Sequence, residues 1–233
     1  VYLDNASTTR VYDEVVKEMK KYMTLEYGNP SSTHDLGENA FEAINEARKK
    51  FALELGCKIE EIIFTSGATE SNNLALLGYA RANANSKKKK IIISKIEHSS
   101  IYECANELKK EGFDIVEIPV NGVGLIDMDK LEREIDEGTL MVSVIHVNNE
   151  IGVIQNIALI GKICKQKKAI FHTDCVQSFG KENIKVNDMN IGLLSASAHK
   201  IHGSKGIGLL FVKNGIKLGR IIYGGEQEKG LRA

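Results

Sequence analysis

The sequence has little of what marks a disordered, strongly charged or fibrous protein. Only two of its 233 residues are proline and no segment is of low complexity, which excludes a disordered or fibrous chain. Its 31 basic residues balance 31 acidic ones, so no broad positive charge predicts binding to DNA, RNA or an anionic membrane. The length and a hydrophobic content of 42% instead predict a globular protein with a sizeable core.

The four cysteines lack the pattern of a metal site or of a disulfide framework. No two of them have CxxC spacing, and the six histidines add no metal-binding spacing, so we expect no metal. Unpaired cysteines are typical of a reducing compartment. The sequence opens on a strand-like Val1-Tyr2-Leu3 without a secretory signal, and no apolar run is long enough to span a bilayer. We therefore expect a cytoplasmic protein, or one in the matrix of an organelle if a presequence has been removed.

Apolar residues recur at helical spacing near the N-terminus and then alternate between strand-like and helical patterns. Helices are predicted over 15–23 and 40–55, with Gly56 ending the second, and the turn-forming residues 27–34 predict a loop between them. Strands are predicted at 62–64, 91–93, 115–118, 141–145, 169–171 and 207–212. Helices at 71–82, 101–110, 128–135 and 157–168 separate the first five.

These predicted strands are apolar on both faces, which indicates a sheet covered on each side. Strands of this kind, separated by helices, predict a mostly parallel sheet and therefore an α/β fold, a three-layer α/β/α sandwich. Ligands of such sheets bind beyond the carboxyl ends of the strands. Polar residues follow three predicted strands at that edge: residues 65–69, then Asn148 and Asn149, then Asp174 and Gln177. We expect the functional site there.

The segment 197–200, taken with Asp174 upstream, contains the groups that hold pyridoxal phosphate (PLP). Lys200 supplies an amine that can form an imine, and the carboxylate of Asp174 can keep a ring nitrogen protonated. Ser197 and His199, which precede the amine in the sequence, can bind the phosphate. A lone lysine is ordinarily a solvent-exposed residue and an aspartate after a strand can be a helix N-cap, so the indication comes from the combination.

Residues 66–73 and His98 are two further candidates. Residues 66–73 lie where a strand gives way to a helix, so Gly67 and free backbone amides could meet a phosphate group; the alternative is an ordinary helix cap. His98 could lie flat against a cofactor ring and move protons near neutral pH, or be an ordinary surface or core histidine. Cys175, next to Asp174, fits a small packing residue better than a nucleophile.

Taken in order, these motifs closely resemble those of the cysteine desulfurases, PLP enzymes of the aspartate aminotransferase fold type. The likeness spans nearly the whole chain and implies the PLP-binding large domain of that fold. The matching segments are 2–9, 27–34, 64–73, 97–98, 146–152, 174–177, 197–200 and 224–232.

The resemblance implies a role for each matching position. Lys200 would be the Schiff-base lysine and Asp174 the partner of the pyridine nitrogen. Gln177 would hydrogen-bond the phenolic oxygen of the ring, His98 would stack on the ring and move protons, and Asn149 would orient cofactor and substrate. The remaining site residues would hold the phosphate, through the backbone near Ala68 and the side chains of Thr69, Ser197 and His199.

The implied reaction removes sulfur from L-cysteine, releases L-alanine and leaves a persulfide on an enzyme cysteine. The resemblance also implies a homodimer and transfer of the sulfur to an iron–sulfur scaffold or a thiolation enzyme. Two alternatives remain open at this point. One is a related PLP enzyme, such as a selenocysteine lyase or a class V aminotransferase; the other is a non-catalytic PLP-fold subunit or scaffold.

The sequence departs from the family pattern at its C-terminal side. Ala233 follows a Gly-Leu-Arg segment after which family members usually continue with Ser-Gly-Thr and a small domain. The resemblance implies that this part holds the persulfide-forming cysteine, the arginine for the substrate carboxylate and a threonine lent to the neighbouring subunit. We expect residues 1–14 to pack with that small domain and residues 15–233 to form the PLP-binding large domain of a longer chain.

Overall fold

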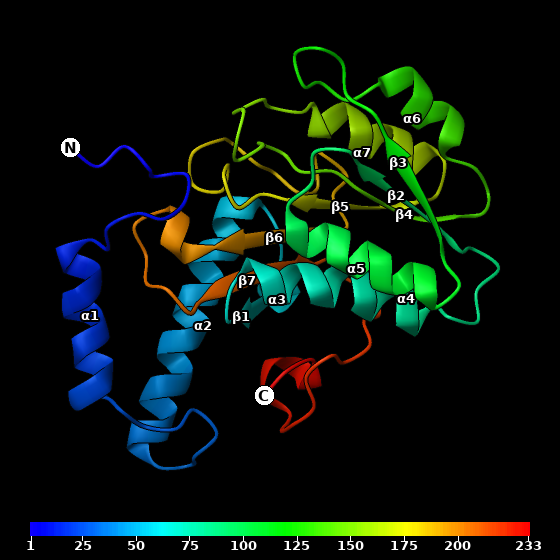
Figure 1. Ribbon diagram of the computed structural model, residues 1–233. Helices are drawn as coiled ribbons and strands as arrows, with labels where there is room; N and C mark the ends of the chain where they lie inside the picture. Colours follow the sequence, from blue (N-terminus) through cyan, green and yellow to red (C-terminus); the bar gives the residue numbers. More distant parts are fainter.

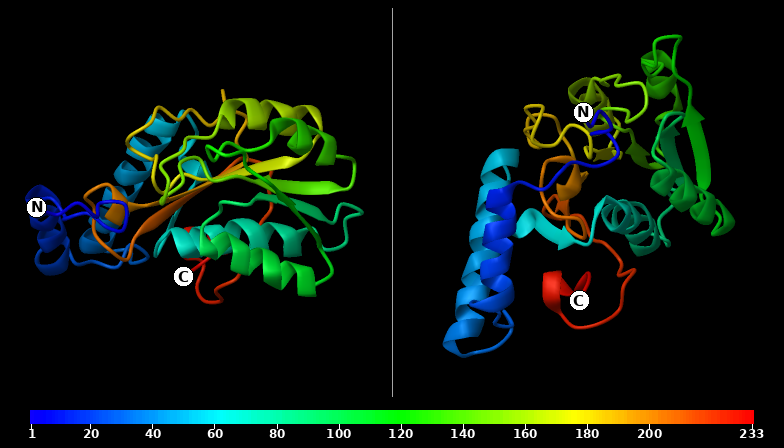
Figure 2. Two further views of the ribbon diagram at one scale, coloured as in Figure 1. Left: turned by 45° about the horizontal axis from the view of Figure 1, so that its top comes forward. Right: turned by 60° about the vertical axis from the view of Figure 1, so that its left-hand side comes forward.

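The computed structural model describes all 233 residues and places a seven-stranded sheet between two layers of helices (Figure 1, Figure 2). The strand order across the sheet is β1-β7-β6-β5-β4-β2-β3. Strand β7 is antiparallel to both of its neighbours and every other pair is parallel, which confirms the mostly parallel sheet. The strands are β1 (Ile62–Thr65), β2 (Lys90–Ser94), β3 (Asp114–Ile118), β4 (Thr139–Ser143), β5 (Ile170–Asp174), β6 (Leu193–Ser197) and β7 (Gly208–Val212).

Each face of the sheet has its own hydrophobic core, as the three-layer prediction requires. Along β2, Ile92 packs into one core while Ile91 and Ile93 pack into the other, because successive side chains of a strand point to opposite faces. Helices α3 (Ala68–Asn73), α4 (Tyr79–Ala82) and α5 (Ser99–Lys110) cover one face. Helices α6 (Met128–Glu134) and α7 (Ile157–Gln166), with the C-terminal end of α2 (Asp35–Leu55), cover the other.

Strand β6 is the one strand of the sheet that the sequence pattern did not predict. Its sequence is Leu-Leu-Ser-Ala-Ser, so it contains only two large apolar residues and resembles a loop. All five residues are nevertheless buried in the centre of the sheet. The serine in the middle is compatible with this position because the oxygen Oγ of Ser195 lies 3.1 Å from Nε2 of His172 on β5.

Several element boundaries differ from the predicted ones for identifiable reasons. The helix predicted over 71–82 begins at Ala68 and contains a π-helical turn at Leu74–Gly78 between α3 and α4. Helix α2 begins at Asp35, where the Nδ1 atom of His34 accepts a hydrogen bond from the backbone of Gly37. It ends at Gly56 as predicted, with a left-handed φ of 67° that glycine tolerates well.

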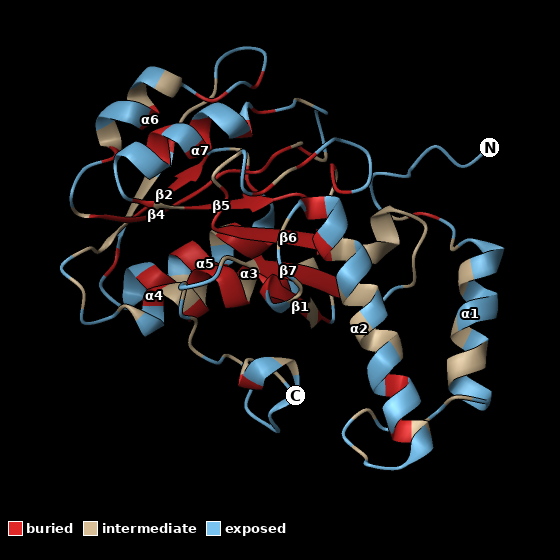
Figure 3. Ribbon diagram, turned by 180° about the vertical axis from the view of Figure 1, so that it is seen from behind, coloured by how far each residue is buried: buried red, intermediate tan, exposed pale blue.

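Helix α1 (Asp13–Thr24) stands apart from the sandwich, beside α2, and none of its residues is buried (Figure 3). The segment before it is tied to the sheet edge, because the backbone N–H groups of Thr9 and Tyr12 donate to the carbonyls of His199 and His202. The predicted boundary at residue 14 falls within α1. That residues 1–14 pack with a small domain stays a prediction. No helix has an apolar stretch that could traverse a bilayer.

Candidate functional site

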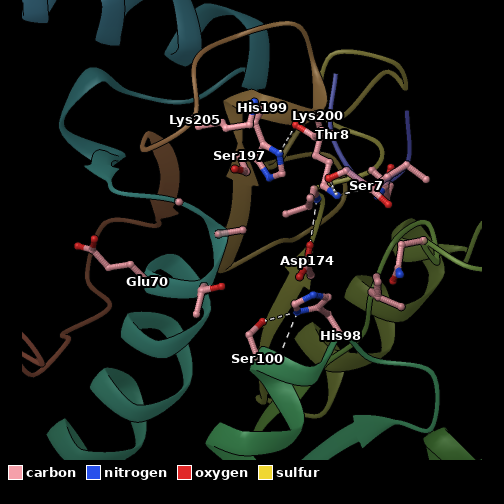
Figure 4. Close-up of a pocket in the computed structure, with 18 of the residues that line it drawn as sticks. Ser7, Thr8, Glu70, His98, Ser100, Asp174, Ser197, His199, Lys200 and Lys205 are labelled. Atoms are coloured by element: carbon pink, nitrogen blue, oxygen red, sulfur yellow. Dashed lines mark hydrogen bonds between the residues drawn. The ribbon is translucent and has the colours of Figure 1, made fainter. Parts of the chain in front are cut away.

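A cavity of about 850 Å³ opens beyond the carboxyl ends of the central strands, where the sequence predicts the site (Figure 4). It lies where β1, β5 and β6 give way to the segments that follow them. All nine predicted site residues line it: Ala68, Thr69, His98, Asn149, Asp174, Gln177, Ser197, His199 and Lys200. Five residues without a predicted role line it as well: Asp4, Ala6, Ser7, Thr8 and Lys205.

Asp174 is the last residue of β5 and is 2% exposed. Burial raises the pKa of its carboxyl group, while hydrogen bonds from the backbone of Val176 and the side chain of Asn72 lower it. These bonds are 2.9 Å and 2.8 Å long and use both carboxyl oxygens. Asp174 forms no salt bridge with any basic side chain of the chain. A buried carboxylate of this kind is favourable only with a cationic or donating partner in the cavity.

Lys200 follows β6 on a short 3₁₀ turn and is partly buried. Burial lowers the pKa of its amine, and Lys181 acts in the same direction, whereas the charges of Asp4 and Asp174 raise it. Its Nζ atom donates to the backbone carbonyls of Ala6 and Ser7, the latter at 2.7 Å. No carboxylate forms a salt bridge with this ammonium group. Lys200 can therefore leave the two carbonyls and bond a ligand without breaking an ion pair.

Gly67 and the start of α3 form one wall of the cavity. A Cβ atom placed on Gly67 would meet no protein atom within 4 Å, so the space beside these backbone amides is open. Gly208 at the start of β7 allows the backbone of Gly67 to pack close against β7. A Cβ atom on residue 208 would be 2.6 Å from the Cα of Gly67. The amides at the start of a helix and the helix dipole favour a negatively charged group in such a space.

Glu70 holds Ser66, the residue before Gly67 in this wall, through hydrogen bonds. Its Oε2 atom accepts from the backbone and hydroxyl of Ser66 at 2.8 Å and 2.5 Å, and its Oε1 atom accepts from Nε of Arg232 at 2.5 Å. Burial raises the pKa of Glu70, but these hydrogen bonds and the charge of Arg232 outweigh burial and lower it overall. The C-terminal segment therefore helps to hold the loop that lines the cavity.

Basic groups gather on the side of the cavity formed by the segment after β6. Lys200 and Lys205 both line it, and burial together with these two charges lowers the pKa of His199. The Nδ1 atom of His199 lies 3.1 Å from the hydroxyl oxygen of Thr8 (Figure 4). Ser197, which is 6% exposed, lies on the same wall. This combination of hydroxyl, imidazole and ammonium groups is suited to a phosphate.

Gln177 and Asn149 both reach the cavity, and neighbouring contacts place each of them. The Nε2 atom of Gln177 donates to the carbonyl of Ala6 at 2.8 Å, so Gln177 and Lys200 share this acceptor. Asn148 holds the loop that presents Asn149: its Nδ2 atom donates to the carbonyl of Ile96 at 2.8 Å. Its Oδ1 atom also accepts two backbone N–H groups of the same loop.

His98 caps the N-terminus of α5 at the floor of the cavity (Figure 4). Its Nδ1 atom lies 2.8 Å from Oγ of Ser100 and accepts from the backbone N–H of Ser100 at 3.1 Å. Ser100 in turn accepts from Nδ2 of Asn72 at 2.9 Å. Asn72 lies within the candidate segment 66–73, but its contact with Ser100 could not be predicted because the two residues lie on different helices.

Glu97, next to His98, is a second buried acid near the site. Burial raises its pKa to about 8, and the charge of Asp174 also raises it, whereas hydrogen bonds from Ser94 and Ile145 lower it. Its Oε1 atom accepts from the hydroxyl of Ser94 and, at 2.8 Å, from the backbone N–H of Ile145. Its Oε2 atom has no hydrogen-bond partner. Glu97 thus ties the loop before α5 to the segment after β4.

The four cysteines are all unpaired, and burial raises the pKa of each thiol to about 12: Cys57, Cys104, Cys164 and Cys175. A thiol acts as a nucleophile in its thiolate form, which is scarce at such a pKa. Cys175, adjacent to Asp174, is fully buried and does not line the cavity. The structure therefore agrees with the prediction that it is a packing residue.

Comparisons with known proteins agree with this arrangement. The aminotransferase class-V family model matches residues 1–231. The chain is 45% identical over 233 residues to the cysteine desulfurase IscS of Dictyoglomus turgidum, covering 100% of this chain and 59% of that protein. It is 47% identical over 236 residues to the mitochondrial cysteine desulfurase of Candida maltosa, covering 100% of this chain and 49% of that protein. The chain thus spans 49% to 59% of the length of these two relatives.

Solved structures show the same similarity. A NifS-like protein superposes with a TM-score of 0.97 at 39% identity, covering 100% of this chain and 64% of that one. The structure of SspA in complex with cysteine superposes with a TM-score of 0.96 at 41% identity, covering 100% of this chain and 67% of that one. The fold is therefore that of NifS-like proteins.

Proposed function

Because this chain belongs to the aminotransferase class-V family, we propose that it is the cofactor-binding part of a PLP-dependent cysteine desulfurase. One observation supports this most directly. A single cavity holds the amine of Lys200, whose pKa is lowered, together with the buried carboxylate of Asp174, which forms no salt bridge within the chain. Such a pair suits a cofactor that has an aldehyde and a basic ring nitrogen.

The lining residues fit PLP at each of its functional groups. Asp174 would receive the protonated ring nitrogen as the cation that its buried carboxylate lacks. The open space beside Gly67 and the basic groups near Lys205 would receive the phosphate. Gln177 would turn from the carbonyl of Ala6 to the phenolic oxygen of the ring, and Asn149 would orient the bound molecules. The phosphate would be held by the backbone at Ala68 and the side chains of Thr69, Ser197 and His199.

When bound, PLP would supply an aldehyde that an amine can bond and a ring that withdraws electrons from the substrate Cα atom. The residues of the chain would do the rest. Asp174 would keep the ring nitrogen protonated because its own charge stabilises that proton. Lys200 would be the base that takes the proton from the substrate Cα atom, and its lowered pKa suits that role.

We propose L-cysteine as the substrate. The support is the name of the relatives and the complex of SspA with cysteine. The sulfur would pass to a cysteine thiol, and we infer that this thiol is none of the four described above, because burial keeps each of them protonated. The products would be L-alanine and an enzyme persulfide, which an iron–sulfur scaffold or a thiolation enzyme would accept.

Three further statements stay predictions: a homodimer, a cytoplasmic location and a small domain that packs with residues 1–14. The location is supported by the four unpaired cysteines, which are typical of a reducing compartment. The exposed surface of α1, which has no buried residue, supports a packing partner near the N-terminus.

Product analysis tests the proposed function. The purified full-length protein is incubated with PLP and L-cysteine in the presence of a thiol reductant. We expect L-alanine and sulfide in equal amounts. A keto acid instead of alanine would indicate a class V aminotransferase, and release of selenide from selenocysteine without activity on cysteine would indicate a selenocysteine lyase. Bound PLP without any product would indicate a non-catalytic subunit or scaffold.

A further inference from the structure

Four side chains from three different elements form a continuous hydrogen-bonded chain at the floor of the cavity. Asp174 lies at the end of β5, Asn72 on α3, Ser100 on α5, and His98 at the N-cap of α5. The links are 2.8 Å from Asn72 Nδ2 to Asp174 Oδ2, 2.9 Å from Asn72 Nδ2 to Ser100 Oγ, and 2.8 Å from Ser100 Oγ to His98 Nδ1. Asn72 is fully buried and Ser100 is 8% exposed, so the two links that Asn72 makes are shielded from water.

The direction of each bond follows from which groups can donate. An ionised carboxylate only accepts, so the Asn72 atom that faces Asp174 must be the amide nitrogen. That nitrogen has two hydrogens, and the second one points to Ser100 Oγ. The Ser100 oxygen therefore accepts from Asn72, and its own single hydrogen is free for Nδ1 of His98.

The backbone gives the same assignment without reference to Asn72. The N–H of Ser100 lies 3.1 Å from Nδ1 of His98, and a backbone N–H can only donate. Two donors thus converge on Nδ1, which leaves no room for a hydrogen on that atom. The hydrogen of the neutral ring must be on Nε2, the nitrogen that makes no hydrogen bond within the chain.

We propose that Asn72 and Ser100 are positioning residues that hold His98 as the Nε2–H tautomer, so that His98 offers the cavity a hydrogen-bond donor and is not the acceptor of the Cα proton. The consequence for the substrate rests on the proposed function; the tautomer itself does not. A base needs a lone pair, and Nε2 of this tautomer has none to offer. A neutral imidazole can instead stabilise negative charge that develops on a nearby atom by donating to it.

The two candidate catalytic residues, Lys200 and His98, would then have different roles. Lys200 would take the proton from Cα, and His98 would hold a hydrogen bond to the bound molecules throughout. Asn72 also links Asp174 to His98. It donates one amide hydrogen to Asp174 and the other to Ser100, which in turn donates to His98. A change of charge on Asp174 would therefore reach His98 through the amide of Asn72 and the hydroxyl of Ser100.

Histidine ¹⁵N NMR of the protein without cofactor tests the tautomer directly. We expect an unprotonated Nδ1 and a protonated Nε2 for His98. Ser100→Ala is expected to raise the ratio of the Nδ1–H tautomer of His98 to the Nε2–H tautomer about fivefold, because one of the two donors to Nδ1 is lost. Asn72→Ala should shift it in the same direction. Ser99→Ala, at the exposed neighbouring serine, should leave it unchanged and Ser100→Thr should restore it. Unchanged His172 signals would show that each variant folds.

A hydrogen on Nδ1 of His98 in the unaltered protein would overturn the proposal, and so would a tautomer ratio that Ser100→Ala does not move in a folded protein. A second test uses His98→Gln and His98→Ala. Glutamine can donate a hydrogen bond but cannot carry a proton, so kcat for alanine release should be at least about tenfold higher in His98→Gln than in His98→Ala. Equal losses of kcat would contradict the donor role. The NMR result stands even if the protein does not act on cysteine, so the two failures are distinguishable.

Discussion

The amide nitrogen of Asn72 lies 2.8 Å from the carboxylate of Asp174, although 102 positions separate the two residues in the sequence. This bond favours the charged form of a carboxylate whose pKa burial raises. Asn72→Ala should therefore raise the pKa of Asp174 further and weaken PLP binding about tenfold, as expected for a lost hydrogen bond to a charged group. The absorbance of bound PLP during a titration measures the affinity.

Asn83→Ala provides the matched control for this change. Asn83 also donates through its side-chain amide, at 2.8 Å to the carbonyl of Tyr79, but it lies at the far end of α4. Its removal should leave PLP affinity unaltered. Equal affinities of the Asn72→Ala protein and the unaltered protein would show that Asn72 does not support the charge of Asp174.

Gly208→Ala should displace Gly67 and the start of α3, which form the wall of the cavity where the phosphate is proposed to bind. The new Cβ would lie 2.6 Å from the Cα of Gly67 and 2.8 Å from the carbonyl oxygen of Ala196, so the wall has to move. Overpacking of this kind costs about 1 to 3 kcal/mol. We expect a lower free energy of unfolding and weaker binding of PLP, measured by denaturant titration and by absorbance. Gly122→Ala, where a Cβ meets no atom within 4 Å, should change neither.

Glu97 should give the protein a stability that falls with rising pH. Burial raises its pKa from 4.5 to about 8, so between these values the folded chain holds a proton that the unfolded chain has released. Its contribution is fully present below about pH 4.5 and is lost as pH rises to about 8. Glu97→Gln removes this titration, so its free energy of unfolding relative to the unaltered protein should increase by a few kcal/mol across that interval.

Denaturant titrations at intervals between pH 4.5 and 8 measure this difference. Glu103→Gln is the matched control, because it removes a carboxylate from the exposed surface of α5. A constant difference between Glu97→Gln and the unaltered protein would mean that folding does not raise the pKa of Glu97.

The buried thiols should resist alkylation in the folded protein. Burial raises the pKa of each to about 12, and Cys57 alone is partly exposed. With iodoacetamide near neutral pH, we expect slow modification that begins at Cys57, and four modifications once the chain is unfolded in denaturant. Mass spectrometry of the intact and digested protein follows both. Rapid labelling of Cys175 in the folded state would contradict the assignment of that residue to packing.

The position of the site could be predicted from the sequence because it follows from strand order alone. In a parallel sheet the carboxyl ends of the strands meet at one edge, so residues 65–69, Asn149 and Asp174, which follow predicted strands, were expected to lie at the same edge. Gly56 was predictable for a local reason, since a helix that ends in a left-handed residue favours glycine. Strand β6 was not, because its serines weaken the apolar pattern and their partner, His172, is on another strand.

The contacts that shape the cavity were beyond the reach of sequence patterns because they join distant segments. The carbonyl of Ser7 meets Lys200 across 193 positions, and Arg232 meets Glu70 across 162. Neither spacing has a periodic or motif signature. The direction of the His98 side chain is a similar case, since Asn72 and Ser100 fix it together from two helices.

The central claim is that Lys200 bonds the cofactor, and reductive trapping tests it most directly. The protein is mixed with PLP, reduced with borohydride, digested and analysed by mass spectrometry. A pyridoxyl-phosphate adduct on the peptide containing Lys200 is the expected result, and Lys200→Ala should abolish it. Lys205 lines the same cavity, so an adduct on Lys205 in the unaltered protein, or no adduct on any lysine, would contradict the account.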